Sequence, residues 1–203
     1  MTDLTGKVVL ITGAGKGAGR LLAQAFAERG ALVAANDISP INVEHVVEEI
    51  HSRGGQARAY IEDVAKKIGA QYIVNQVEED FGRIDILINH ASVEPHVPLL
   101  QIDEWDWHRV LDVNLTGTFL MTQSAGRLMR AQGGGMILNI VPAKDPGTGA
   151  SAAFIATING LEGFTRQAAL ELKPYGVHVQ AIKSGEDVVS RVMTLLVDEK
   201  DKP

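Results

Sequence analysis

The 203-residue chain is predicted to be an α/β protein, with one doubly wound parallel sheet of about six strands and helices on both faces. Short apolar runs alternate strictly with longer segments of helical periodicity, and these runs are continuous, as in parallel strands buried on both sides. A glycine-rich turn also joins the first strand to the first helix. At this length we expect one domain over 1–203, with a flexible tail at 198–203.

The apolar runs predicted as strands lie at 8–11, 31–37, 57–61, 84–89, 136–141 and 177–182. The predicted helices lie at 21–26, 43–50, 68–81, 103–130, 151–173 and 188–197. Asp103 is the expected N-cap of the long helix, which the glycines at 133–135 end, and Gly82 caps the helix over 68–81. Strands and helices therefore alternate from end to end.

Composition narrows the possible partners and location. The net charge of −6 argues against nucleic acid and anionic membranes as main partners. The chain has no cysteine, which suits a reducing cytoplasm. The N-terminus lacks a basic segment followed by an apolar one, and no apolar run reaches the ~18 residues that a membrane span needs. We expect a cytoplasmic protein, and we predict no metal site.

The glycine-rich turn follows the first strand directly and opens the first helix. In this context the free backbone N–H groups of a helix N-terminus can bind a phosphate, and glycines let a pyrophosphate approach the backbone. The predicted cofactor-binding residues of this turn are Thr12, Gly13, Gly15, Lys16, Gly17, Ala18 and Gly19. Together with the alternating elements, the turn predicts a Rossmann-type dinucleotide-binding fold.

Asp37 ends the second strand about 20 residues beyond the turn, with Ile38 beside it. A carboxylate there accepts hydrogen bonds from ribose hydroxyls and repels a 2′-phosphate, which favours NAD over NADP. Lys16 opposes this preference if it meets that phosphate, but as a solvated loop side chain it has no effect. Asp63 and Val64, after the third strand, either border the adenine or serve as a helix N-cap and a core valine.

Over nearly its full length the chain resembles the short-chain dehydrogenases/reductases. The matching segments are the turn over 12–19, Asp37, Asp63-Val64, Asn89-His90-Ala91-Ser92 in place of Asn-Asn-Ala-Gly, and Asn114-Leu115-Thr116-Gly117. The resemblance implies that Asn89 steadies the central strand, with Ala91 beside the cofactor. It also implies that Asn114 belongs to a catalytic tetrad and holds a proton-relay water.

The other tetrad members are missing. The family has a Ser after the fifth strand and a Tyr-x-x-x-Lys pair on the next helix, where the ammonium lowers the pKa of the phenol. Counting back from Gly163-Phe164-Thr165 places Phe154 at the tyrosine position and Ile158 at the lysine position. The serine position falls on Val141 or Pro142. Asn114 is the one tetrad member retained.

A second departure from the family follows the sixth strand. There the family has Pro-Gly, a substrate lid and later a seventh strand, and a closed lid excludes water from the nicotinamide. Here the residues over 182–187 pass almost directly into the last helix. The half of the site for adenosine and pyrophosphate is retained, whereas the nicotinamide half is dismantled.

Other side chains could take the place of the missing tetrad members. His90, His96, Lys144, Ser151 and Lys183 are expected near the cleft. His90 and His96 titrate in a useful range, but each of the five is more simply a solvated loop residue. Trp105 and Trp107 either line the cleft mouth or pack the long helix, and Tyr175 lies at the far end of its helix.

Three hypotheses follow, in order of preference. The first is a family member that binds NAD(H) without ordinary carbonyl or alcohol redox catalysis. The second is an active NAD(P)-dependent oxidoreductase that uses unconventional residues such as His96 or Lys183. The third is a non-catalytic structural partner subunit. In each case we expect a homodimer through the helices near 103–130 and 151–173, because the second of these carries apolar residues on more than one face.

Overall fold

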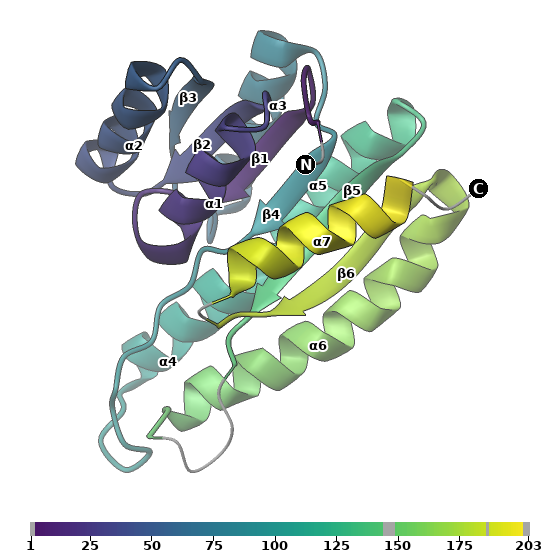
Figure 1. Ribbon diagram of the computed structural model, residues 1–203. Helices are drawn as coiled ribbons and strands as arrows, with labels where there is room; N and C mark the ends of the chain where they lie inside the picture. The colour runs from purple at the N-terminus through teal and green to yellow at the C-terminus, as the bar shows by residue number, and fades with distance from the viewer. Residues whose placement is uncertain (1–2, 144–148, 186, 201–203) are drawn as a thin grey trace.

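The structure, a computed structural model, describes residues 3–143, 149–185 and 187–200. Its centre is a six-stranded sheet in the order β3-β2-β1-β4-β5-β6, with every neighbouring pair parallel (Figure 1). The strands are β1 (Val8–Thr12), β2 (Leu32–Asp37), β3 (Gln56–Ile61), β4 (Ile86–Asn89), β5 (Gly135–Val141) and β6 (Val177–Lys183). The predicted Rossmann-type α/β fold class is confirmed.

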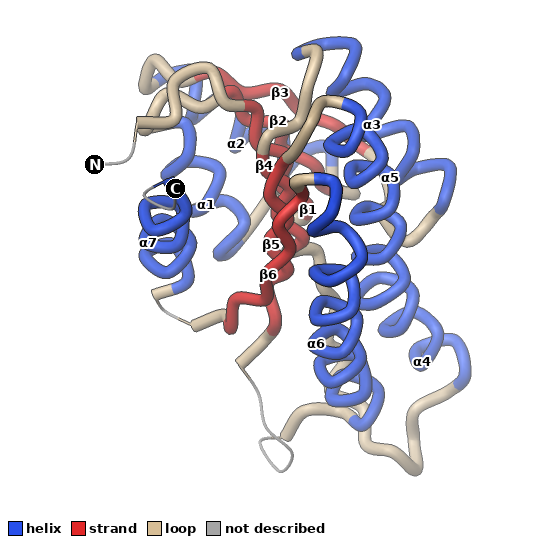
Figure 2. Tube along the Cα trace, turned by 90° about the vertical axis from the view of Figure 1, so that its right-hand side faces the viewer, coloured by secondary structure: helices blue, strands red, loops and turns tan. Residues whose placement is uncertain are grey.

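Helices cover both faces of the sheet. Figure 2 shows α1 (Gly17–Ala27), α2 (Pro40–Ser52) and α7 (Val188–Lys200) on one face. The opposite face carries α3 (Lys67–Phe81), α4 (Glu104–Leu111), α5 (Gly117–Ala131) and α6 (Ala152–Leu172). Short helical turns at Asp112–Thr116 and Lys173–Tyr175 complete the described helical segments.

Alternating strand residues build two apolar cores. On β1, Val9 and Ile11 face the core beneath α1 and α7, while Val8 and Leu10 face the core beneath α3 and α5. All four of these side chains are at most 1% exposed. A third, smaller cluster joins α4 to the N-terminal half of α6. The continuous apolar runs of the sequence are therefore strands buried on both faces.

The order of the strands creates a switch point between β1 and β4. From β1 the chain continues outward to β2 and β3, and then crosses back to β4 on the other side of β1. In open parallel sheets, ligands bind outside the carboxyl ends of the strands at such a point. Thr12 and Asn89 are the last residues of these two strands.

Several predicted boundaries differ from the structure, and three of the differences concern the ends of β4, β5 and α7. Strand β4 begins at Ile86 rather than at residue 84, because the Gln132 side chain bonds both the N–H (3.3 Å) and the carbonyl (2.6 Å) of Ile84. Gly135 starts β5 instead of ending the preceding helix, since its N–H donates to Gly176. The last helix continues to Lys200, so 198–200 are helical, and 201–203 of the predicted tail lie outside the described residues.

The predicted helix over 103–130 is also interrupted. Asp103 caps it as predicted, accepting from Asp106 N at 2.7 Å. A π-helical turn at Asp112–Thr116 then separates α4 from α5, where the Gly117 N–H donates to the Asp112 carbonyl. Such turns relax the regular helical ladder and occur often at functional sites. No helix in the described parts of the chain is long and apolar enough to cross a membrane.

Candidate functional site

Three glycines shape the turn between β1 and α1. Gly13 has φ +65°, and a Cβ there would lie 2.8 Å from the Cα of Ala91. Gly17 has φ +54°, and a Cβ there would meet nothing within 4 Å. Gly19 is packed most tightly, since a Cβ would lie 2.1 Å from the Gly13 carbonyl oxygen. The three glycines thus provide a tight turn, an open backbone and close contact between helix and strand.

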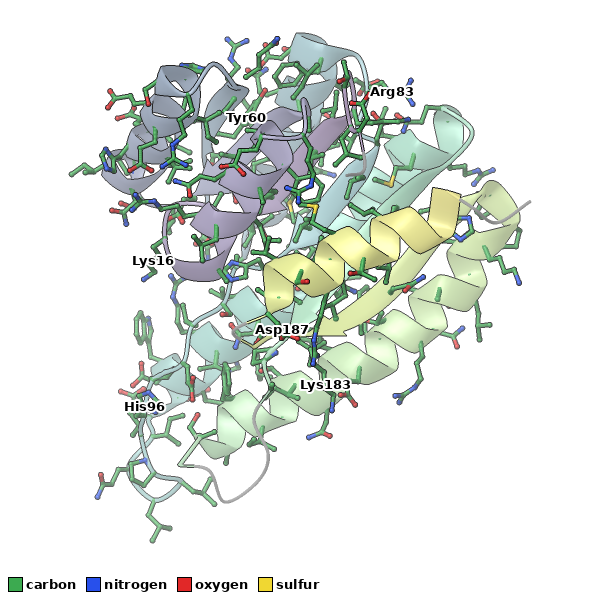
Figure 3. The ribbon with its side chains drawn as sticks, viewed as in Figure 1. Lys16, Tyr60, Arg83, His96, Lys183 and Asp187 are labelled. Atoms are coloured by element: carbon green, nitrogen blue, oxygen red, sulfur yellow. The ribbon has the colours of Figure 1, made fainter. Side chains whose placement is uncertain are left out.

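The N-terminus of α1 has no side-chain cap. Lys16 is the N-cap residue but its side chain makes no capping hydrogen bond, and the first turn of this eleven-residue helix holds no acidic residue. Figure 3 shows the Lys16 side chain on the outside of the turn, and the residue is exposed. Ala18 instead packs against the core beneath α1. The helix end therefore leaves backbone donors for an anion.

Asp37 connects the end of β2 to this turn. Its Oδ2 accepts from Gly15 N and its Oδ1 accepts from Ser39 N, both at 2.9 Å. A Cβ at Gly15 would lie 2.8 Å from Oδ2, so this glycine is required for the contact. The carboxylate is only 9% exposed, whereas the adjoining Ile38 is 57% exposed. Asp37 is thus held against the turn.

Thr12 fastens the turn to the segment after β4. Its Oγ1 accepts from the backbone N–H groups of His90 (3.0 Å) and Ala91 (3.1 Å). Thr12 is 2% exposed, and both hydrogen bonds are part-buried. The residues predicted at the ends of β1 and β4 are therefore brought together.

Asn89 starts a buried polar chain across the sheet. Its Nδ2 donates to Thr122 Oγ1 (3.1 Å) and to Asn139 Oδ1 (2.9 Å). Asn139 in turn donates to Thr165 Oγ1 at 2.8 Å, which links β5 to α6. This chain agrees with a steadying role for Asn89. Sequence reasoning missed the part played by Asn139, although a lone amide within the apolar run over 136–141 was a signal for it.

Asp63 and Val64 lie after β3, and neither is the N-cap of α3. That helix begins after Lys66, while Asp63 Oδ1 accepts from Ala65 N at 3.0 Å and so closes a local turn instead. Asp63 also lies 3.5 Å from Arg109 of α4. Val64 is 6% exposed and belongs to the core, as one of the two alternatives predicted.

Asn114 lies in the π-helical turn and is 6% exposed. Its side chain accepts from Val93 N (2.8 Å) and donates to Val93 O (3.0 Å). Its own carbonyl accepts from Thr118 Oγ1 at 3.0 Å. Both its amide and its carbonyl therefore have protein partners, which hold the loop after β4 against the helix.

The positions that replace the tetrad form an apolar cluster. Phe154 is 2% exposed, Ile158 7% and Val141 1%, and all three pack with Val110 of α4. Ile158 and Pro142 share with Asn114 the wall of a cavity of only about 10 Å³. The chain thus brings these positions together, but with apolar groups and almost no free space between them.

The segment after β6 is tied to the end of β5. Ser184 N donates to Val141 O at 2.7 Å, and Ser184 Oγ accepts from Ala143 N at 3.3 Å. Helix α7 starts at Val188, only a few residues later. The described part of this connection holds no segment long enough to cover the cavity beside Asn114.

Neither of two substitutes proposed from sequence is a fully solvated loop residue, since Ser151 is buried and His90 is half-buried. Ser151 is 5% exposed, because it caps α6 by accepting from Phe154 N at 3.2 Å. The His90 imidazole is shielded by the turn, and burial lowers its pKa below 6.5. Of the remaining candidates, Lys144 lies outside the described residues.

His96 and Lys183 are solvated, as the simpler interpretation expected. His96 is 68% exposed and lies 3.7 Å from Glu94, while Lys183 is 64% exposed and lies 3.7 Å from Glu162 of α6. Figure 3 shows them on separate elements, His96 in the loop after β4 and Lys183 at the end of β6. Each pairs with a carboxylate rather than facing the small cavity.

The aromatic candidates also differ in how far they are packed against other residues. Trp107 packs against the cluster of α4 and α6, whereas Trp105 is 70% exposed. Tyr175 lies under the guanidinium of Arg130, 4.3 Å from its ring centroid, after the end of α6. A cavity of about 380 Å³ lies at the amino ends of the strands and is lined by Lys7, Asp85 and Met136, and none of these aromatic residues lines it.

A doubly wound parallel sheet with a glycine-rich turn at its switch point places this chain in the Rossmann-like class of α/β proteins. Comparison with known proteins makes the assignment specific. The model of the short chain dehydrogenase family matches residues 7–197. The chain belongs to the short-chain dehydrogenase/reductase family of oxidoreductases.

Individual relatives agree with this assignment. An uncharacterized oxidoreductase from Thermotoga maritima is 41% identical over 195 residues, which cover 94% of this chain and 77% of that protein. A metagenomic short-chain oxidoreductase solved with NADP has a TM-score of 0.89 at 29% identity, over 96% of this chain and 92% of that one. An NAD⁺-bound xylitol dehydrogenase has a TM-score of 0.85 at 31% identity, over 97% and 78%.

Proposed function

We propose that this chain binds NAD(H) at the carboxyl edge of its sheet and lacks the ordinary carbonyl or alcohol redox chemistry of its family. One contrast carries the proposal. The turn and Asp37 are built for a dinucleotide, whereas the tetrad positions hold a packed apolar cluster. Bound NAD(H) would supply a hydride donor or acceptor at its nicotinamide. The chain's own residues determine whether a proton can accompany that hydride.

The preference for NAD rests on Asp37. Its carboxylate is fixed by Gly15 N and Ser39 N at the edge of the site, where it can accept from ribose hydroxyls and repel a 2′-phosphate. Lys16 points outward and is the opposing charge in the turn. Solved relatives hold NADP in one case and NAD⁺ in another, so the preference depends on these residues of this chain.

The loss of chemistry rests on Phe154, Ile158 and Asn114. Phenylalanine has no proton to give, and isoleucine has no charge to lower the pKa of a neighbour. Both side chains are buried, and Ile158 also lines the small cavity of about 10 Å³ beside Asn114. The carbonyl of Asn114, the residue to which the family resemblance assigns a relay water, already accepts one hydrogen bond from Thr118 Oγ1.

Binding is tested by calorimetric titration of the purified chain with NAD⁺, NADH and NADP⁺. We expect NAD⁺ and NADH to bind more tightly than NADP⁺. Gly17→Ala should weaken binding, and Gly82→Ala is its matched control. Both glycines have positive φ, and a Cβ at either meets nothing within 4 Å, but Gly82 caps α3 far along the chain from the turn. No binding at millimolar cofactor, or equal weakening by both variants, would contradict the site.

Catalysis is tested separately by mixing the chain with NADH and a panel of carbonyl compounds in single-turnover experiments. We expect a flat absorbance trace. Hydride transfer would instead support the alternative of an active oxidoreductase with unconventional residues. In that case His96→Ala and Lys183→Ala should be compared, because loss of turnover in one of them identifies the acid.

We also propose a homodimer through α5 and α6. Phe119 of α5 is 41% exposed and meets Phe164 of α6 edge to face, with 6.3 Å between ring centroids. Leu170 adds an apolar side chain that is 69% exposed on α6. Exposed apolar groups on adjoining helices favour association. Sedimentation at micromolar concentration should show a dimer that Phe119→Glu dissociates, and a wild-type monomer would refute it.

A further inference from the structure

The His90 side chain fills the space between β4 and the glycine-rich turn. A Cβ at Gly19 would lie 2.8 Å from His90 Nδ1, and one at Gly13 would lie 3.2 Å from it. Nδ1 has no contact with solvent and no hydrogen bond of ordinary geometry to the described residues. The imidazole therefore contacts the first turn of α1. Its Nδ1 atom, although polar and shielded from solvent, has no hydrogen-bond partner of ordinary geometry among the described residues.

Charge around the imidazole comes mainly from one group. Asp37 at the end of β2 is the carboxylate whose charge acts on it, and that charge favours protonation. The other charged side chains nearby in the chain are directed elsewhere. Lys16 points out of the turn, Arg20 of α1 pairs with Glu49 of α2, and Glu94 lies beside His96.

Burial sets the starting protonation state. Desolvation lowers the pKa of His90, and the nearby backbone of Gly13 and Thr12 and the charge of Asp37 only partly oppose this effect. In the free protein the ring is therefore neutral at neutral pH. One of its nitrogens then lacks a proton, and Nδ1 is left without a good hydrogen bond.

We propose that His90 is a positioning residue of the pyrophosphate turn, and that it takes up a proton when an anionic dinucleotide binds. This proposal rests on the NAD(H) binding proposed above. A diphosphate at the N-terminus of α1 adds negative charge to the turn that the imidazole touches, so it favours the imidazolium. The imidazolium carries a proton on both nitrogens, which gives Nδ1 a proton to donate toward the Gly13 backbone.

Proton linkage fixes the direction of the pH effect. If binding raises the pKa of His90, dinucleotide affinity increases as the pH falls through the range in which the ring titrates. A role in packing alone would leave affinity independent of pH. Proton uptake on binding is therefore the measurement that distinguishes a positioning role of His90 from a role in packing alone.

The experiment is calorimetric titration with NAD⁺ at about pH 6 and about pH 8, in two buffers of different ionisation enthalpy at each pH. Wild type should bind more tightly at the lower pH, by at most about tenfold for each unit by which NAD⁺ raises the pKa of His90, and take up a fraction of a proton there. His90→Asn, which restores the residue typical of the family, should show neither effect. His108→Asn is the matched control, since this histidine of α4 is 60% exposed, and it should behave as wild type.

The outcomes are distinguishable. Wild-type binding that is independent of pH, or proton uptake that persists in His90→Asn, overturns this proposal and leaves NAD(H) binding intact. No binding by wild type at either pH overturns both. If His90→Asn does not fold, the ring resonances of His90 in wild type provide the measurement by NMR. NAD⁺ should raise their titration midpoint, and an unmoved midpoint refutes the linkage.

Discussion

Gly19→Ala tests how closely the turn is packed. Gly19 is the third residue of α1, where alanine would ordinarily stabilise a helix by about 1 kcal/mol relative to glycine. Here the new Cβ would lie 2.1 Å from the Gly13 carbonyl oxygen, whose chain segment is itself held by neighbouring elements. Carbon and oxygen atoms ordinarily approach to about 3.3 Å, so helix or turn must shift by about 1 Å.

Overpacking of this kind costs about 1–3 kcal/mol, which exceeds the gain in helix propensity. We therefore expect Gly19→Ala to lower the free energy of unfolding by up to about 2 kcal/mol and to weaken NAD⁺ binding. Urea unfolding followed by circular dichroism measures the first effect, and calorimetric titration measures the second.

Gly163→Ala is the control for helix propensity. It lies within α6, and the nearest atom to its added Cβ would be Arg166 Nη2 at 3.9 Å. This variant should be more stable than wild type by about 0.5–1 kcal/mol. If Gly19→Ala were equally stabilised, the packing argument would be wrong and local propensity would dominate the turn.

Three further predictions concern buried polar groups. Thr12→Val leaves the N–H groups of His90 and Ala91 without their acceptor and should cost about 2 kcal/mol by urea unfolding, whereas Thr12→Ser should restore most of it. Burial alone would raise the pKa of Asp85, but hydrogen bonds from a backbone N–H and two cationic side chains outweigh it and lower that pKa below 3.8. The stabilisation from Asp85 is therefore present above about pH 4 and lost as the pH falls further, so Asp85→Asn should lower stability at pH 7 and differ little from wild type near pH 2. Asn139→Leu removes the bridge between β4 and α6 and should cost about 1–3 kcal/mol, and an unchanged urea midpoint would contradict a structural role for that chain.

Local sequence determined the order of elements and the place of the turn. Apolar runs such as Val8–Thr12 are strands because they can be buried on both sides, and this property is visible in the residues themselves. The glycines at 13, 17 and 19 predicted a tight turn, because the backbone freedom of glycine does not depend on its surroundings. The absence of a tyrosine and a lysine at 154 and 158 was equally evident from sequence spacing.

Only the tertiary structure decided what surrounds these residues. His90 and Ser151 resemble loop residues in the sequence, but the turn shields one and α6 uses the other as its cap. The π-helical turn at Asp112–Thr116 was not predicted either, since the sequence indicated one continuous helix over 103–130.

The residues at the predicted tetrad positions also show what the sequence determined and what only the tertiary structure decided. The family resemblance placed Phe154 and Ile158 at the tetrad positions, but it did not show that they pack with α4 or that Ile158 lines a cavity of about 10 Å³. Burial and packing join residues far apart in the chain, so they depend on the whole fold. The sequence by itself determined the fold class and the apolar residues at 154 and 158, and the tertiary structure decided that these side chains are buried in one cluster with α4.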